Sequence, residues 1–559
     1  MRLSGADILV KTLIEQGCDV VFGYPGGQIL NVYDSLYKYS KEIRHILTAH
    51  EQGAAHAADG WARATGRVGV VISTSGPGAT NLVTGIATAY LDSVPMVAIC
   101  GNVPTSQIGT DSFQEIDITG VTLPITKHNY FVSSAEDLAD TIREAFALAS
   151  SGRPGPVLID VPKDVQIAMC DYEPLASSKS DNERNSAKDI CITQAAECIA
   201  SSQRPFIYFG GGLIASEAQD ELLELAEKID APIGCSMMGL SGVPTDHPRF
   251  LGMQGMHGHY SSSTAMHNAD CIISLGVRFN DRVTGNKEKF ATGAKIVHID
   301  IDCSELSKTV KEAHSLRGDI KITLKKLIAG LESVKHPQWQ KTIDEFKKDE
   351  IKFSDQRPGM TPKNVIEMLN GFLGENTPVA TDVGQHQMWS AQYLKFCKSR
   401  RFISSGGLGT MGFGIGAAIG AAIGTGERAV LITGDGSFGM CLQEMATAVS
   451  NNIPLVVLIL NNGVLGMVRQ WQTLFYEKHY SNTILNRKTD FVGIARAFGA
   501  DGERVQTTDE LRLAFEKAFR AEGTFVIDCA IDKDEFVLPM LPPGGSMDDI
   551  IVSKEGDEA

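Results

Sequence analysis

The chain has 559 residues, 43% hydrophobic and 21% charged, a composition typical of globular proteins and a length that suits about three to five domains. Its formal net charge of −16 argues against a nucleic-acid partner, because phosphate binding needs clustered Lys and Arg. The eleven cysteines are scattered and form no C-x-x-C pair, so we predict neither a zinc site nor a disulfide framework, and we expect free thiols in a reducing cytoplasm.

The first third of the chain is predicted to alternate helices and strands. Its N-terminus has no apolar signal core and no Arg/Ser-rich transit segment, so a domain is expected to begin at once, with Ser4 capping a helix over 5–16. An apolar strand and glycine turn at 70–81 lead through a helical pattern to a second apolar strand at 93–101. Continuous apolar strands separated by helices are typical of a parallel sheet covered on both faces.

Glu51 follows a predicted strand over 44–47 and opens a helix. The simplest interpretation is a solvated carboxylate at a helix start, where the helix dipole favours it. His50 and His56 do not have the four-residue separation of a zinc-binding H-E-x-x-H motif, so that kind of metal site is set aside.

The middle third is also predicted to be α/β, with strands over 206–209, 271–275 and 295–301. Polar stretches rich in Ser, Asn, Pro and charge flank it at 173–189 and 335–362, and we interpret both as linkers.

The predicted fold class is therefore α/β, with three doubly wound parallel-sheet domains. Their expected ranges are 1–172, 190–334 and 360–535, and an acidic C-terminal tail over 536–559 follows them.

An uncharged stretch over 402–426 carries glycine at every fourth position from Gly412 to Gly424. The same stripe occurs in pairs of membrane helices. Nine of these 25 residues are glycine and few are large and apolar, so we predict a buried helix packed closely on its neighbours rather than a membrane span.

The most informative pattern lies in the last third. A G-D-G-S turn at 434–437 is followed by a predicted helix over 442–449, an apolar strand over 455–460, and then Asn462. In such a βαβ unit the carboxylate of Asp435 and the amide of Asn462 meet at the sheet edge where α/β proteins bind ligands. A carboxylate and an amide oxygen suit Mg²⁺, while the glycines and the helix start suit a diphosphate.

The strand, glycine turn, helix and strand of the last third repeat the pattern of the first third, around a different middle block. This layout resembles the thiamine diphosphate-dependent decarboxylase superfamily. Within it, the chain is similar to the large catalytic subunits of biosynthetic acetolactate synthase, also called acetohydroxyacid synthase. The most specific motifs are F-G-Y-P-G-G (22–27), H-E-Q-G-A-A-H-A-A-D-G (50–60), F-Q-E (113–115), I-T-K-H-N-Y (125–130), G-V-R-F-N-D-R-V-T-G (276–285), G-L-G-T-M-G-F-G (407–414), L-G-M-V-R-Q-W (465–471) and V-L-P-M-L-P-P-G-G (537–545).

The resemblance implies three cofactors: thiamine diphosphate, Mg²⁺ and FAD. The first domain would bind the pyrimidine ring, the last the diphosphate, and the central domain the flavin. Glu51 would hold a proton on a pyrimidine nitrogen, which makes the neighbouring amino group a base. Met411 would support the bent cofactor from below, although it could equally fill the core. The other residues predicted at the active-site wall are Gly27, Gln114 and Lys127.

The remaining assignments carried by the resemblance concern ligands. For thiamine diphosphate they are Val383, Gly384, Gln385, His386, Gly409, Met411, Asp435, Gly436, Ser437, Asn462 and Met467. For the metal they are Asp435, Asn462 and the backbone carbonyl of Val464. For FAD they are Arg153, Gly210, Gly211, Gly212, His257, Gly276, Val277, Arg278, Asp300 and Asp319.

Two residues are assigned to the second substrate, a 2-ketoacid. Arg282 would bind its carboxylate, a task that suits a guanidinium fork. Trp471 would favour 2-ketobutyrate over pyruvate, a preference limited to roughly 1–3 kcal/mol per methylene. Asn280 stands where the family usually has Asp, which leaves the flavin affinity open.

The expected activity is that of a cytoplasmic carboligase that joins pyruvate to pyruvate or 2-ketobutyrate in branched-chain amino acid synthesis. The resemblance also implies a homodimer or homotetramer and a small regulatory subunit. Alternatives are a flavin-free catabolic acetolactate synthase, a pyruvate oxidase and, less closely, glyoxylate carboligase, which lacks an acid at the position of Glu51. A non-catalytic nucleotide-binding scaffold or an NAD-dependent dehydrogenase would not need Glu51, Met411, Asp435 and Asn462 together.

Overall fold

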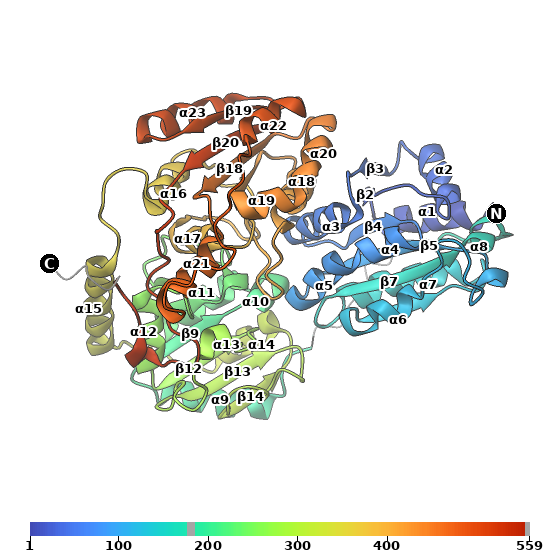
Figure 1. Ribbon diagram of the computed structural model, residues 1–559. Helices are drawn as coiled ribbons and strands as arrows, with labels where there is room; N and C mark the ends of the chain where they lie inside the picture. Colours follow the sequence, from blue (N-terminus) through green and yellow to red (C-terminus); the bar gives the residue numbers. More distant parts are fainter. Residues whose placement is uncertain (176–184, 554–559) are drawn as a thin grey trace.

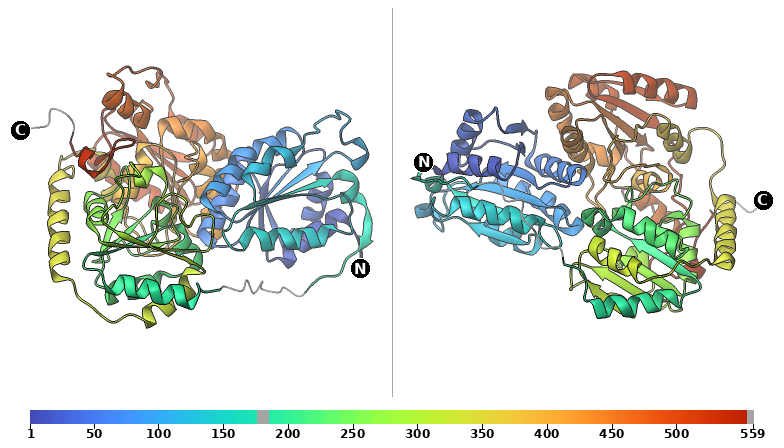
Figure 2. Two further views of the ribbon diagram at one scale, coloured as in Figure 1. Left: turned by 90° about the horizontal axis from the view of Figure 1, so that it is seen from below. Right: turned by 180° about the vertical axis from the view of Figure 1, so that it is seen from behind.

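The structure is a computed structural model that describes residues 1–175 and 185–553. They form three domains, each built on a six-stranded sheet in which neighbouring strands are parallel, so the predicted α/β fold class is confirmed. The N-terminal domain lies beside the other two, which are stacked on each other (Figures 1 and 2). Parts of the predicted linker (176–184) and tail (554–559) lie outside the described residues.

The two outer sheets have the same strand order. The N-terminal sheet runs β3 (Arg44–Leu47), β2 (Val20–Gly23), β4 (Gly69–Ser73), β5 (Met96–Asn102), β7 (Pro156–Pro162), β6 (His128–Phe131). The C-terminal sheet runs β16 (Phe402–Ile403), β15 (Val379–Thr381), β17 (Ala429–Gly434), β18 (Leu455–Asn461), β20 (Phe525–Ala530), β19 (Asp501–Val505). The repeat noticed in the sequence therefore reflects two domains of one topology.

The central sheet differs in its order. It runs β11 (Phe250–Met253), β10 (Ile233–Cys235), β9 (Pro205–Phe209), β12 (Cys271–Leu275), β13 (Lys295–Asp300), β14 (His314–Arg317). With the strands counted along the chain this is the order 3-2-1-4-5-6 of dinucleotide-binding folds. A short antiparallel pair, β1 (Arg2–Ser4) with β8 (Met169–Asp171), closes the N-terminal domain.

Helices cover both faces of the sheets (Figure 1). In the N-terminal domain they are α1 (Gly5–Glu15), α2 (Leu30–Lys38), α3 (Glu51–Thr65), α4 (Pro77–Asn81), α5 (Val83–Asp92), η1 (Thr105–Gln107), α6 (Ile118–Thr122), η2 (Leu123–Ile125), α7 (Leu138–Ser150) and α8 (Lys163–Ile167). In the central domain they are α9 (Asp189–Ala200), α10 (Gly211–Ser216), α11 (Gln219–Lys228), η3 (Met237–Gly239), α12 (Tyr260–Asn268), α13 (Asp281–Thr284) and α14 (Ile320–Ala329), with α15 (Pro337–Phe353) after it. In the C-terminal domain they are α16 (Pro362–Asn370), α17 (Gln385–Tyr393), α18 (Phe413–Thr425), α19 (Asp435–Cys441), η4 (Leu442–Glu444), α20 (Met445–Ser450), α21 (Gly466–Phe475), α22 (Phe491–Ala497) and α23 (Thr508–Arg520), with η5 (Met547–Asp549) in the tail.

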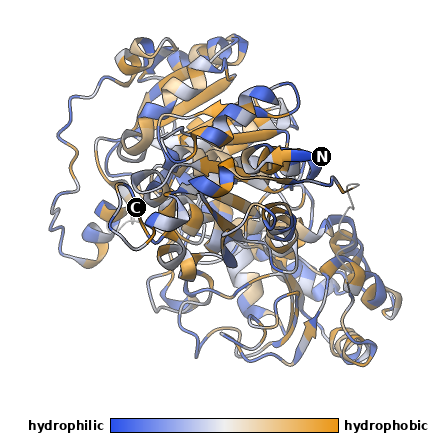
Figure 3. Cartoon of the chain, turned by 90° about the vertical axis from the view of Figure 1, so that its right-hand side faces the viewer, coloured by the Kyte–Doolittle hydropathy of each residue, from blue (hydrophilic) through white to orange (hydrophobic). Residues whose placement is uncertain are grey.

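Most predicted elements are confirmed. Ser4 caps α1 by accepting a hydrogen bond from the backbone N–H of Asp7 at 3.2 Å. The predicted helix over 442–449 is split into η4 and α20. The strands β4, β5, β7, β12 and β17 are buried along their whole length, which explains their unbroken apolar sequences and the apolar colour of the sheets in Figure 3.

The interpretation of 335–362 as a linker is wrong over α15. Pro337 occupies the first turn of this helix, where a missing N–H costs nothing. Trp339 and Ile343 share one face and are buried with Phe346 partly buried beside them, and they pack on the core of the central domain. The many charged residues around these three apolar positions favoured a linker, although the spacing of the three is helical.

Residues 413–425 of the glycine-rich stretch form α18, which packs against α3 of the N-terminal domain, as predicted for a buried helix. The first part of the stretch is not helical: it forms β16 and the loop over 404–412. A Cβ on Gly420 would lie 1.9 Å from the carbonyl oxygen of Ala57, and one on Gly60 would lie 2.1 Å from that of Ala417. The two backbones are thus in direct contact, which only glycine allows. Within the described ranges no helix is both long and apolar enough to cross a membrane.

Candidate functional site

The acid and the amide predicted at the sheet edge lie together. Asp435 begins α19 directly after β17, and Asn462 follows β18, which is the parallel neighbour of β17. The backbone N–H of Asn462 lies close enough to the Asp435 carboxylate to lower the pKa of that group. Burial raises the pKa of Asp435 to about 6 although backbone hydrogen bonds oppose the shift. A divalent cation beside this carboxylate would stabilise its charged form.

The chemistry of these groups fits a magnesium site. The Asn462 side-chain oxygen accepts from the N–H of Val464 at 3.1 Å, so the amide and the predicted backbone ligand belong to one turn. Within 1–175 and 185–553, no three His, Cys, Asp or Glu side chains are grouped as a metal site. The pair thus offers one carboxylate with neutral oxygens, a set that suits Mg²⁺ completed by phosphate and water.

His386 provides a second observation that fits a bound diphosphate. Its side chain is buried, and burial lowers its pKa to about 3, a shift that the backbone carbonyl of Asp382 opposes. The Nε2 atom has no partner among the described residues. A buried ring nitrogen without a partner is uncommon in folded proteins. It lies beside Gly384 and Gly434, where an added Cβ would meet the ring at 2.8 and 2.9 Å.

Gln385, predicted as a ligand of thiamine diphosphate, uses its side-chain amide inside the fold. Its Nε2 donates to Gln470 at 3.0 Å and to the backbone oxygen of Glu535 at 2.7 Å, so both side-chain donors are used inside the fold. The residue opens α17, and there its backbone N–H still points outward from a helix start. Long-range partners such as Gln470 are not visible in the local motif.

Asp382 is a site residue that the sequence analysis missed. Its buried carboxylate accepts the N–H groups of Gly412 at 2.7 Å and Val383 at 3.1 Å, and the hydroxyls of Thr433 and Ser437. It therefore joins the three segments expected to hold the diphosphate. An acid at the end of β15, directly before the matched V-G-Q-H sequence, was the available signal.

The loop between β16 and α18 brings the predicted cofactor support to the same place. Gly409 has φ +69° and faces Val383, whose Cγ1 lies 4.0 Å from the position of an added Cβ. Met411 lies close to the G-D-G-S turn, since its Cε is 3.9 Å from a Cβ built on Gly436. The N–H of Gly412 also lies 3.4 Å from Ser437 Oγ.

A cavity of about 1060 Å³ extends from this region into the central domain. Such a volume is at the upper end of the range for small-molecule sites. It is lined by sixteen of the predicted residues, namely Arg153, Gly211, Gly212, His257, Gly276, Val277, Arg278, Arg282, Asp300, Asp319, Val383, Gly384, Gly409, Met411, Met467 and Trp471. Some of the residues assigned to thiamine diphosphate, to FAD and to the substrate thus share one cavity, whereas His386 and the predicted metal ligands Asp435, Asn462 and Val464 are not among its lining residues.

The flavin-side residues come from the carboxyl edge of the central sheet. Gly210 lies against the carbonyl of Gly276, and Cβ atoms on Gly212 and Gly276 would collide at 2.7 Å or less with each other's backbone. This close approach of β9 and β12 loops leaves their backbone open to a ligand. His257 is buried with Nδ1 unpartnered among the described residues, and burial lowers its pKa to about 4. Burial likewise raises the pKa of Asp300 to about 6.

Arg153 and Asp319 line the cavity, and both also bind other groups of the protein. Arg153 Nη1 lies 2.7 Å from Glu305 and 3.3 Å from Asp302, and its Nε donates to Ser93 Oγ at 2.8 Å. Asp319 caps α14 by accepting from Ile322 at 3.0 Å.

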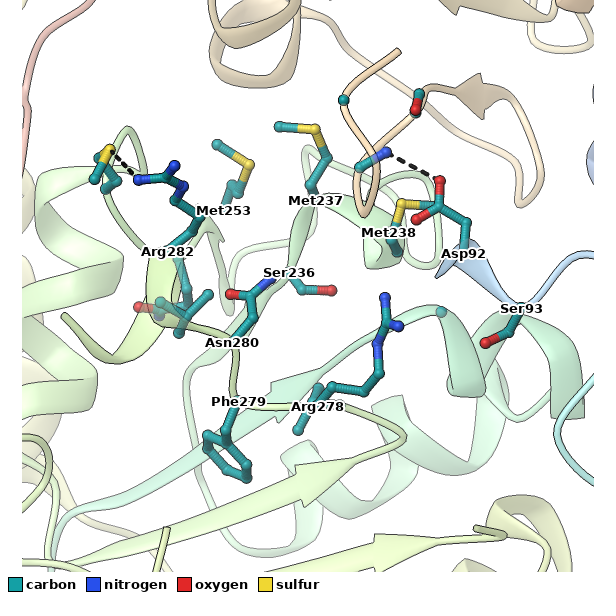
Figure 4. A pocket seen from close by; sticks show the side chains of 18 of the residues that line it. Asp92, Ser93, Ser236, Met237, Met238, Met253, Arg278, Phe279, Asn280 and Arg282 are labelled. Atoms are coloured by element: carbon teal, nitrogen blue, oxygen red, sulfur yellow. Dashed lines mark hydrogen bonds between the residues drawn. The ribbon is translucent and has the colours of Figure 1, made fainter. Parts of the chain in front are cut away.

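Arg282 and Trp471, both assigned to the second substrate, lie side by side. The guanidinium carbon of Arg282 is 5.8 Å from the centre of the Trp471 ring, within cation–π range. Arg282 is more than half exposed, and Figure 4 shows it on the opposite side of the cavity from Asp92 and Ser93. An exposed cation at one end of a largely apolar cavity can bind a carboxylate.

Three of the four predicted catalytic residues form a separate group in the N-terminal domain. Glu51 accepts from Asn81 Nδ2 at 2.9 Å, and its Oε1 is 3.3 Å from a Cβ built on Gly78. Gln114, with φ +64°, rests on Gly76 of the same turn. Gly27 lies in the neighbouring loop, where the backbone N–H of the next residue, Gln28, donates to Thr74 Oγ1 at 3.3 Å. None of these three lines the cavity of the chain.

Lys127 lies apart from that group. Its ammonium donates to the carbonyl oxygens of Leu148 and Ser151, at 2.8 Å for the latter, and so binds the C-terminal end of α7. Burial lowers its pKa, with a further contribution from the nearby Arg153. Its role at an active-site wall stays a prediction.

Comparisons with known proteins agree with this arrangement. The thiamine pyrophosphate enzyme N-terminal binding domain matches residues 3–121, the central domain 192–327, and the C-terminal binding domain 382–529. The chain is 46% identical to a probable acetolactate synthase large subunit of Methanocaldococcus jannaschii, over 98% of this chain and 95% of that one. It is 42% identical to the acetolactate synthase large subunit of Haemophilus influenzae, over 100% and 99%, and 41% identical to the isozyme 3 large subunit of Escherichia coli, over 99% of both.

Fold, site and domain matches define a thiamine pyrophosphate enzyme. Within that class, the identities over nearly the whole chain show that it belongs to the family of acetolactate synthase large subunits.

Proposed function

We propose that the chain is the catalytic subunit of an acetolactate synthase. It would release carbon dioxide from pyruvate and join the remaining two-carbon unit to a second 2-ketoacid, a transferase reaction of branched-chain amino acid biosynthesis. Pyruvate as acceptor gives 2-acetolactate, and 2-ketobutyrate gives 2-aceto-2-hydroxybutyrate. The observation that carries the proposal is the contact between Asp435 and Asn462 at neighbouring strand ends, in a chain of this family.

Thiamine diphosphate, when bound, supplies the electron sink that allows carbon dioxide to leave and the two-carbon unit to attack. Asp435, Asn462 and the Val464 carbonyl would hold Mg²⁺ against the diphosphate. The helix starts at Gln385 and Asp435 would direct N–H groups at the same anion. His386 would use its free ring nitrogen there.

The central domain would hold FAD. Support comes from the dinucleotide-type strand order, the close glycine contacts of Gly212 and Gly276, and the unpartnered nitrogen of His257. No electrons are transferred overall between pyruvate and its products, so the flavin would have no net redox role in this reaction.

Arg282 would bind the carboxylate of the second 2-ketoacid, while Trp471 would shape the space for its side chain. Their contact at 5.8 Å places the charge and the apolar ring at one end of the cavity. A carboxylate there would find a cation and lose little water, because Arg282 is exposed.

We further propose that a complete site needs two chains. Glu51 would hold the proton on the pyrimidine nitrogen, yet it lies in the N-terminal group and not at the cavity of its own chain. In a symmetric dimer the N-terminal group of one chain would close the cavity of the other. The names of the relatives as large subunits support a smaller regulatory partner. The eleven free cysteines support a reducing compartment such as the cytoplasm.

One assay tests the proposal. The purified protein is given pyruvate, and 2-acetolactate and carbon dioxide are measured with thiamine diphosphate, Mg²⁺ and FAD omitted in turn. Product that needs thiamine diphosphate and Mg²⁺ supports the proposal. Loss of pyruvate that depends on oxygen or a quinone, without 2-acetolactate, would favour a pyruvate oxidase instead, and no turnover under any condition would refute both.

A further inference from the structure

A buried cluster of three charged side chains lies where the N-terminal domain meets the cavity. Arg63 of α3 donates from Nε to Asp59 at 2.5 Å and from Nη2 to Asp92 at 3.0 Å. Both carboxylates are fully buried and the arginine side chain is 8% exposed. A buried cluster of charged side chains contributes less to stability than apolar packing of the same volume, so a role other than stability is sought in the groups that it binds.

The cluster holds the start of a loop from another domain. We call residues 404–412, between β16 and α18, the glycine loop. The two oxygens of Asp92 accept the N–H groups of Gly406 at 3.0 Å and Gly407 at 2.7 Å, and Arg63 donates to the carbonyl of Ser404 at 2.9 Å. Figure 4 shows Asp92 at the cavity wall with one of these bonds drawn.

Four residues of the glycine loop line the cavity: Ser405, Gly406, Gly409 and Met411. Its far end is fixed by Asp382, which binds the N–H of Gly412 at 2.7 Å. At its near end, Gly406 and Gly407 have no side chains that could pack on the protein, and both residues are exposed. A loop of this composition is free to move unless its backbone is bound. The carboxylate of Asp92 supplies that binding.

The next residue, Ser93, lies beside Asp92 and contacts another residue of the cavity wall. Ser93 ends α5 in the left-handed region, with φ 59°, a position where glycine is the usual choice. Its hydroxyl accepts from Nε of Arg153, which also lines the cavity. One helix end of the N-terminal domain therefore contacts both the glycine loop and Arg153.

We propose that Asp92 is a positioning residue. It holds the glycine loop so that Gly409 and Met411 keep their places in the cavity wall, and it acts on the cofactor through that loop. The two exposed glycine N–H groups could bond water equally well, so the fold itself gains little from them, whereas a preorganised site does. The inference rests on the proposed function for the identity of the cofactor.

The test compares Asp92→Asn with Asp59→Asn. Each removes one carboxylate charge from Arg63. Among the described residues the Asp59 carboxylate accepts hydrogen bonds from Arg63 and none from the glycine loop, so its variant controls for general destabilisation. Two quantities are measured on the full-length protein: hydrogen exchange of the glycine-loop amides, and the affinity for thiamine diphosphate in the presence of Mg²⁺, followed by tryptophan fluorescence.

Asp92→Asn is expected to speed exchange at Gly406 and Gly407 by at least about 10-fold and to weaken cofactor binding by about 10- to 100-fold, the range for supporting residues. Asp59→Asn should change both by less than about 3-fold. Equal effects of the two variants, or unchanged loop exchange in Asp92→Asn, would overturn the inference. Failure of the wild-type protein to bind thiamine diphosphate would instead refute the proposed function. The hydrogen-exchange data would still test whether Asp92 holds the glycine loop.

If Asp92→Asn fails to fold, Gly407→Ala tests the same contact from the other side. Its Cβ would lie 2.8 Å from Asp92 Oδ1 and 3.0 Å from the carbonyl of Leu91, so the loop must leave the helix end while the acid remains. Faster loop exchange and weaker cofactor binding support the inference, and wild-type values for both contradict it.

Discussion

Replacing Gly420 by alanine tests the contact between the N-terminal and C-terminal domains. The new Cβ would lie 1.9 Å from the carbonyl oxygen of Ala57 and 2.9 Å from the N–H nitrogen of Trp61, where ordinary contact begins at 3.4 Å. Both obstacles are backbone atoms of α3, so the two helices must separate. Alanine gains about 1 kcal/mol of helix propensity, but overpacking and lost contacts cost about 1–3 kcal/mol or more.

We expect a net loss of about 2 kcal/mol, which lowers the Tm by about 4–8 °C for a domain of this size. The matched control is Gly424→Ala on the same helix, where the nearest atoms belong to the side chains of Thr65 and Trp61 at 2.7 and 2.9 Å. Side chains can shift, so the control should lose less than half as much. Both variants are measured by thermal unfolding at one protein concentration. A Gly420→Ala protein as stable as wild type, or as stable as the control, would refute the reasoning about the helix contact.

Three further predictions follow from single contacts. Trp471→Leu should reduce the preference for 2-ketobutyrate over pyruvate, by an amount within roughly 1–3 kcal/mol, and an unchanged product ratio in a competition assay would contradict this. Ser93→Gly should leave the Tm nearly unchanged, because removing the strain of φ 59° at this residue offsets the added entropy of the unfolded chain. The same change should weaken FAD binding, because Arg153 loses its contact with the serine hydroxyl. Flavin fluorescence measures the affinity, and a wild-type value would count against the prediction. Burial raises the pKa of Asp160 to about 7, above its unfolded value near 4, so its contribution to stability is present at low pH and is lost as the pH rises toward about 7. Asp160→Asn should therefore lose less stability than wild type between about pH 4 and 7. The difference is at most about 1.4 kcal/mol per pH unit, and parallel Tm curves would disprove it.

The local motifs of the sequence predicted the diphosphate side well. Asp435 and Asn462 could be placed together because each follows a strand, and the carboxyl ends of adjacent parallel strands share an edge. The same reasoning explains why the strands at β9, β12 and β13 were found, since buried parallel strands are unbroken apolar runs.

Other features depend on contacts that no local pattern reveals. The side-chain amide of Gln385 donates to Gln470 and Glu535, which lie far along the chain and are not part of its local motif. Asp92 has meaning only once α5 meets a loop more than 300 positions later. Helix α15 is not evident from the sequence because only three apolar residues mark its buried face, among many charged ones. Glu51 could be named from its motif, but its distance from the cavity required the structure.

The most direct test of the account follows the proton on the thiazolium carbon of thiamine diphosphate bound with Mg²⁺. Its exchange with deuterated solvent can be measured by acid quench and proton NMR, for wild-type protein and for Glu51→Gln. The account predicts exchange far faster than in the free cofactor for the wild type, and a loss of several orders of magnitude in a folded Glu51→Gln protein. Exchange at the free-cofactor rate on the wild-type protein, or equal rates in the two proteins, would contradict it.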